Sequence, residues 1–98
     1  MAIDSDNELN KITTLLNQAE GYLDCEKVVI HNLKKHLDNG NSDESIIEYL
    51  NKLSIGLTKK TEIDQLSADC TNYRYAAGFI DTLLKMPYWR SWMQTIKM

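Results

Sequence analysis

The sequence predicts an all-α fold: an antiparallel hairpin of two long helices, with a short helix between them and a short C-terminal helix. Three observations support this fold class. Apolar residues recur every three or four positions from Ile63 to Leu84, which is the spacing that lines one face of an α-helix. A second stripe with the same period lies upstream, from Leu9 to Leu37. The 98 residues include one proline and four glycines, which favours long helices over many short strands.

The length predicts one helical domain that spans residues 1–98. A chain of this size hides roughly 60–70% of the surface that its unfolded form exposes, so its core is thin. Burial against a second copy or another protein would hide more. The two heptad stripes are also the pattern of a coiled coil. We therefore expect self-association or a protein partner.

The first long helix is expected to begin near Asp4, Ser5 or Asp6, which are good capping residues, and to run to about Asn39. Gly21 lies inside it and costs about 1 kcal/mol in a helix interior. Two roles for this glycine remain open, a close crossing with another helix or a bend. The stripe of this helix is Leu9, Ile12, Leu16, Ala19, Leu23, Glu26, Ile30, Leu33 and Leu37.

Glu26 interrupts that apolar stripe. A carboxylate at a core position needs a partner or an opening to water. If the hairpin is antiparallel and Leu37 lies near Ile63, then Glu26 faces Arg74. The sequence thus predicts a structural Glu26–Arg74 ion pair, and the alternative is that Glu26 lies at the edge of the stripe and reaches solvent.

The short helix follows a run of turn-forming residues, 38–43, and is expected to be capped by Ser42. Leu57 and Ile63 are six residues apart and not seven, with Gly56 just before Leu57. We therefore expect a break or sharp kink near residues 54–60, with Thr58 as a new cap. One continuous bent helix is the alternative. The apolar face of the short helix is Ile46, Leu50, Leu53 and Leu57.

The second long helix carries the downstream stripe and is expected to end before Pro87, because the residue before a proline avoids the helical region. Pro87 also suits the first turn of a brief C-terminal helix. The downstream stripe is Ile63, Leu66, Cys70, Tyr73, Ala77, Ile80 and Leu84.

The C-terminal segment is the candidate partner-binding site. It holds both tryptophans of the chain, and Trp, Tyr, Arg and Met are enriched where proteins bind one another. The alternative is that the segment folds back over the open end of the hairpin and buries its tryptophans. The expected binding residues are Tyr88, Trp89, Arg90, Trp92 and Met93.

We expect no enzyme activity, no cofactor and no metal site. His31 and His36 are five residues apart, so they point to different faces of a helix. The residues form no phosphate loop and no nucleophile motif. The two cysteines do not make a disulfide framework, and Cys70 lies in the apolar stripe.

The charge pattern argues against direct nucleic-acid binding, because the net charge is −3 and no face is densely basic. No apolar run approaches the ~20 residues that cross a membrane. No signal peptide is recognised at the acidic N-terminus. The expected location is therefore the cytoplasm, or a particle assembled there.

The segment from Tyr73 to Pro87, YRYAAGFIDTLLKMP, resembles the C-terminal helix of small helical proteins encoded by tailed bacteriophages. Those proteins often show an aromatic residue or Arg, then Gly, Ile, two leucines and a closing Pro. The resemblance covers about fifteen residues, and the tryptophan-rich end departs from it. It implies an accessory structural or regulatory role through protein contacts, in the host cytoplasm or the virion.

A second hypothesis is a small acidic inhibitor of a host nucleic-acid enzyme. Six acidic residues and one lysine lie within residues 1–26, so this half of the chain could imitate the charge of a phosphate backbone. Salt would weaken such binding steeply, whereas binding through aromatic anchors would barely change. The residues considered for this role are Asp4, Asp6, Glu8, Glu20 and Asp24.

Overall fold

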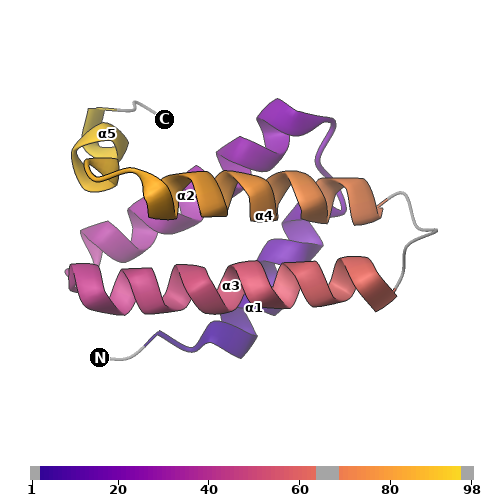
Figure 1. Cartoon of the computed structure of the whole chain (residues 1–98), viewed down its shortest axis with the longest axis horizontal. Coiled ribbons are helices and arrows are strands. Elements are labelled where there is room, and N and C mark those ends of the chain that lie inside the picture. Colours follow the sequence, from indigo (N-terminus) through magenta and orange to yellow (C-terminus); the bar gives the residue numbers. More distant parts are fainter. Residues whose placement is uncertain (1–2, 64–68, 96–98) are drawn as a thin grey trace.

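The computed structural model describes residues 3–63 and 69–95, and these residues form helices and connecting turns without a strand. The all-α fold class is confirmed. Figure 1 shows α3 and α4 lying side by side, α1 and α2 crossing behind them, and α5 at one end. The helices are α1 Ser5–Leu16, α2 Tyr22–Asp38, α3 Asp43–Ile63, α4 Asp69–Lys85 and α5 Trp89–Thr95.

The expected first long helix is divided into α1 and α2 by the turn at residues 17–21. Gly21 has a φ of +92°, a conformation that favours glycine and ends helical geometry. The Asp24 carboxylate accepts a hydrogen bond from the backbone N–H of Glu20 at 3.0 Å. The sequence left open whether Gly21 permits a close helix crossing or marks a bend, and the structure shows the bend. The heptad spacing of the sequence runs across this turn, but Leu23 of the stripe is 70% exposed in the structure.

The helix α3 is continuous from Asp43 to Ile63, so the break predicted near residues 54–60 is wrong. The alternative of one continuous bent helix is wrong too, because α3 and the antiparallel α4 are separate helices. Gly56 has another function than ending a helix. A Cβ atom at this position would lie 2.7 Å from the Leu9 Cδ2 atom, so the missing side chain lets α1 approach α3 closely. Ile63 ends α3 and is 85% exposed. Leu66 of the predicted stripe lies outside the described residues.

An antiparallel pair of long helices is present, but it is made by α3 and α4 (Figure 1). Two contacts set its direction. Ser54 Oγ donates to Asp81 Oδ1 at 2.7 Å, and Cys70 Sγ donates to the Thr61 carbonyl at 3.6 Å. The pattern of the sequence had instead predicted that the helix with the upstream stripe packs antiparallel to the helix with the downstream stripe. Once the turn at residues 17–21 folds α1 back, α2 runs in the same general direction as α4.

The core joins side chains from all five helices. Ile12 and Leu16 enter it from α1, and Trp89 and Met93 enter it from α5. Contributions from the longer helices fill the centre, with Tyr49 as the largest fully buried side chain. Among the described residues, no helix is long and apolar enough to cross a membrane.

Candidate functional site

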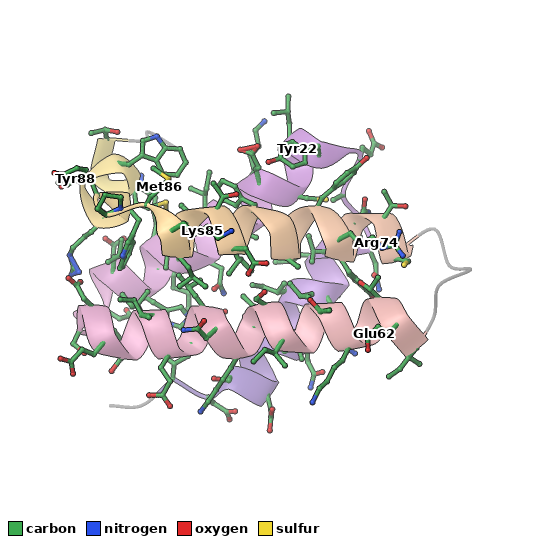
Figure 2. The ribbon with its side chains drawn as sticks, in the orientation of Figure 1. Tyr22, Glu62, Arg74, Lys85, Met86 and Tyr88 are labelled. Atoms are coloured by element: carbon green, nitrogen blue, oxygen red, sulfur yellow. The ribbon has the colours of Figure 1, made fainter. Side chains whose placement is uncertain are left out.

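Most side chains of the predicted C-terminal site are buried or partly buried. Trp89 is 8% exposed and Met93 is fully buried, while Tyr88 is 75% exposed. Trp92 is half-buried, and its ring lies 6.2 Å from the ring of Phe79 at an angle of 63°. Figure 2 shows Tyr88 at the outer end of the molecule, away from Tyr22.

Arg90, the remaining member of that site, forms an ion pair with Asp43 at the start of α3. This pair and the two buried side chains hold α5 against the end of the bundle. The burial of Trp89 and Met93 therefore agrees with the alternative in which the segment folds back. Tyr88 alone among the five keeps a largely exposed side chain.

The predicted Glu26–Arg74 pair does not occur among the ion pairs of residues 3–63 and 69–95. Arg74 is exposed near the start of α4. The expected register assumed one unbroken first helix running antiparallel to α4, and neither condition holds. Glu26 instead lies near Tyr22. Partial burial and then the negative charge of Glu26 raise the pKa of the Tyr22 hydroxyl.

A row of four aromatic rings follows α4 on the side that faces α2 and α5. We call Tyr22, Tyr75, Phe79 and Trp92 the aromatic strip. Tyr22 and Tyr75 meet edge to face with ring centroids 5.3 Å apart. They are 45% and 38% exposed. Phe79 is one helical turn from Tyr75 on α4 and lies against Trp92, but it is only 7% exposed and belongs to the core, so it supports the strip from beneath.

Sequence reasoning missed this strip as a unit. The four-residue spacing of Tyr75 and Phe79 was a usable signal, because residues at that spacing share a helix face. The contribution of Tyr22 had no signal, since it depends on how the turn at residues 17–21 aims α2.

A second feature is a buried polar group of four residues, Glu8, Asn32, His36 and Tyr49, which we call the Glu8 cluster. Asn32 Nδ2 donates to Glu8 Oε2 at 3.0 Å, and the Tyr49 hydroxyl donates to Asn32 Oδ1 at 2.6 Å. His36 Nε2 lies 3.8 Å from Glu8 Oε2. The rings of His36 and Tyr49 meet edge to face at 5.0 Å.

Two lysines place positive charge beside the cluster. Lys35 Nζ lies 3.7 Å and Lys11 Nζ 4.0 Å from Glu8 Oε1. Burial lowers the pKa of His36, although the charge of Glu8 acts in the opposite direction. Burial and Glu8 raise the pKa of Tyr49. Both shifts favour the neutral forms of the His36 and Tyr49 side chains.

His36 Nε2 is buried without a hydrogen-bond partner among the described residues. The other polar atoms of the cluster bond mainly to one another, which links α1 to α2 and α2 to α3. The geometry points to a structural role, because Glu8, Asn32 and Tyr49 are hydrogen-bonded to one another within the bundle.

The acidic residues of the inhibitor hypothesis take different positions. Asp4 accepts the backbone N–H of Asn7 at 3.2 Å and caps α1. Asp24 supports the turn before α2. Glu8 is buried in its cluster. Among the described residues, no group of three or more His, Cys, Asp and Glu side chains is placed to hold a metal ion.

Comparison of the chain with models of protein families, with curated proteins and with solved structures gives no match.

Proposed function

We propose that this chain is a non-enzymatic protein-interaction module that binds a protein partner or a second copy of itself through the aromatic strip. The observation that carries the proposal is the pair Tyr22 and Tyr75. Their rings stand against each other at the surface, each with more than a third of the residue open to solvent.

Rings in this arrangement suit recognition for two reasons. A tyrosine supplies a large apolar area at a low cost in side-chain entropy, and its hydroxyl tolerates water in the free state. The neighbouring contact between Phe79 and Trp92 fixes the far end of the strip. A partner therefore meets a surface that is already ordered, which lowers the entropy cost of binding.

This proposal moves the binding surface away from the C-terminal segment predicted from the sequence. Trp89 and Met93 serve the core, and only Trp92 is shared between the two surfaces. The phage accessory role that the resemblance of the Tyr73–Pro87 segment implies is one setting for such a module. It would place the protein in the host cytoplasm or in the virion.

The acidic-inhibitor alternative has less support. Phosphate mimicry needs carboxylates that face solvent together, whereas Glu8 is buried beside two lysines. Asp4 and Asp24 are engaged with backbone N–H groups. The three side chains serve local structure, which leaves Asp6 and Glu20 as the freely presented acids of the five.

The test compares the unmodified protein with a double variant, Tyr22→Ser with Tyr75→Ser. Light scattering over a range of protein concentrations measures self-association, and affinity capture followed by mass spectrometry identifies another partner. We expect the double variant to weaken the association about tenfold or more, because aromatic anchors dominate binding energy.

The matched control is Tyr88→Ser, which removes an exposed tyrosine outside the aromatic strip. It should leave the association unchanged, and circular dichroism should show the same helix content in all three proteins. Equal association by the double variant and the unmodified protein would contradict the proposal. Loss of association in Tyr88→Ser alone would instead return the site to the C-terminal segment.

A further inference from the structure

A groove of about 370 Å³ lies between α1 and α2, away from the aromatic strip. Its apolar lining comes from Ile12, Leu15 and Val28. Ile12 is fully buried and forms part of the core, whereas Leu15 is 50% exposed. The volume falls within the range of small-molecule sites, which is about 300–1,000 Å³. The complete lining is Glu8, Lys11, Ile12, Leu15, Lys27, Val28, His31, Asn32 and Lys35.

The polar lining of this groove is positive, in a protein whose net charge is −3. Lys27, His31 and Lys35 are spaced four residues apart on α2, so they form one row along the helix. Lys11 adds a positive charge from α1. Glu8 is the single acid in the lining, and Asn32 and the two nearby lysines already engage its carboxylate.

We propose that the α1–α2 groove binds a small amphipathic organic anion, with its apolar body on Leu15 and Val28 and its anionic group on the Lys27 side of α2. Two features select this ligand class. The apolar lining offers a surface that water solvates poorly. The basic row is close enough to reward a negative charge and would reject the corresponding cation.

A second, open hollow of about 470 Å³ shares His31 and Lys35 with the groove and continues along α2 past Lys34 to Asp38 and Asn39. The acid Asp38 lines this extension and disfavours an anion there, which agrees with placing the anionic group beside Lys27. A free amphiphile and an anionic lipid in a membrane share this chemistry, and the proposal commits to the free molecule because the groove lies between two helices of the folded bundle.

The experiment uses decanoate, kept below the concentration at which it forms micelles. Titration is followed by amide chemical shifts in ¹H–¹⁵N spectra of the full chain and by calorimetry. We expect saturable shifts centred on residues 11–15 and 27–35, and weaker binding as the salt concentration rises. Decanol, which has the same chain without the charge, should bind more weakly.

Two variants with matched controls locate the site. Lys27→Gln should weaken decanoate binding about threefold, as expected for one exposed charge, whereas Lys85→Gln on α4 should not. Leu15→Ala should weaken it about fivefold through lost apolar contact, whereas Leu23→Ala, another exposed leucine, should not. Both target side chains reach solvent, so the variants should keep the fold.

Several outcomes would overturn the proposal. One is the absence of saturable shifts in α1 and α2, and another is equal binding of decanol and decanoate. Equal effects of Lys27→Gln and Lys85→Gln would also reject it. Binding to vesicles of anionic phospholipid, or to an acidic peptide, without binding to monomeric decanoate would assign the groove to a different occupant. None of these results depends on the partner of the aromatic strip.

Discussion

Glu8 shows how one buried charge determines local architecture. Its carboxylate accepts a hydrogen bond from the Asn32 amide, and the Asn32 side-chain oxygen accepts one from the Tyr49 hydroxyl. Three helices are thereby linked through polar atoms, while Lys11 and Lys35 neutralise the charge from the solvent side. Removing one partner of such a group costs more than the bond is worth, because the other partner remains buried and unpaired.

The Glu8→Ala variant should therefore lower the free energy of unfolding by about 1–3 kcal/mol. Urea denaturation followed by circular dichroism measures this change. Glu8→Gln should lose less, because its amide oxygen can still accept from Asn32. Glu44→Ala is the control, since Glu44 is exposed at the start of α3. Equal stability of Glu8→Ala and Glu44→Ala would mean that the cluster contributes nothing.

His36 predicts how stability depends on pH. Its pKa in the folded protein lies below the ordinary value of 6.5, so the unfolded chain binds a proton at a pH where the folded protein does not. Stability then falls as the pH drops through and below 6.5, and it is fully present above that range. The urea midpoint should accordingly be lower at pH 5.5 than at pH 7.5.

The groups that face His36 are Glu8, Lys35, Lys11 and the ring of Tyr49. Replacing the histidine by glutamine removes its own titration, so His36→Gln should flatten the pH dependence. His31→Gln is the control, because His31 is exposed and its replacement should leave the dependence intact. A His36→Gln protein with an unchanged pH profile would show that other groups cause the loss of stability.

At the scale of elements, α1 is a short helix held against the bundle at particular points. Ile12 and Leu16 are buried, and Leu9 lies over Gly56 of α3. Asn72 of α4 donates to the Leu16 carbonyl at 2.8 Å and thereby supports the end of α1. The glycine in α3 thus permits a helix contact, whereas the one in α4, Gly78, has open space around it.

Replacing these two glycines by alanine should give different results. Gly78→Ala should stabilise the protein by up to about 1 kcal/mol through helix propensity. Gly56→Ala should stabilise it less, because the new Cβ atom displaces the end of the Leu9 side chain. In a Leu9→Ala background the full gain should return. Thermal unfolding of the unmodified protein, Gly56→Ala, Leu9→Ala and the double variant measures this coupling. If the effects of the two single changes add up to that of the double variant, the contact is excluded.

The sequence correctly indicated which segments form helices, but it did not indicate which helices pack against each other. The apolar periodicity correctly indicated helices around Leu33, Leu53 and Ile80, because burial selects a face at that spacing. It did not reveal the division at Gly21, since the heptad register continues from Leu16 to Leu23 across the turn. It also misjudged Gly56, because a small residue that ends a helix and one that admits a neighbour look identical in sequence.

At the scale of the whole molecule, α3 and α4 form the antiparallel centre, and the other helices cover it. The helix α5 covers the end of the bundle where α3 begins and α4 ends (Figure 1). The Arg90–Asp43 ion pair joins α5 to the first residue of α3. A thin core of this size gains from each large side chain that such a helix adds. This explains why a segment rich in aromatic residues is turned inward here.

The Met93→Ala variant tests this role of α5, because Met93 is fully buried. Truncation should lower the free energy of unfolding by about 2–5 kcal/mol, measured by urea denaturation. Tyr88 is the exposed residue just before α5. Its replacement by alanine should change the free energy of unfolding by less than about 0.5 kcal/mol. If Met93→Ala were as stable as Tyr88→Ala, α5 would not depend on the core. The C-terminal segment would then be available to a partner, and the surface predicted from the sequence would compete again with the aromatic strip.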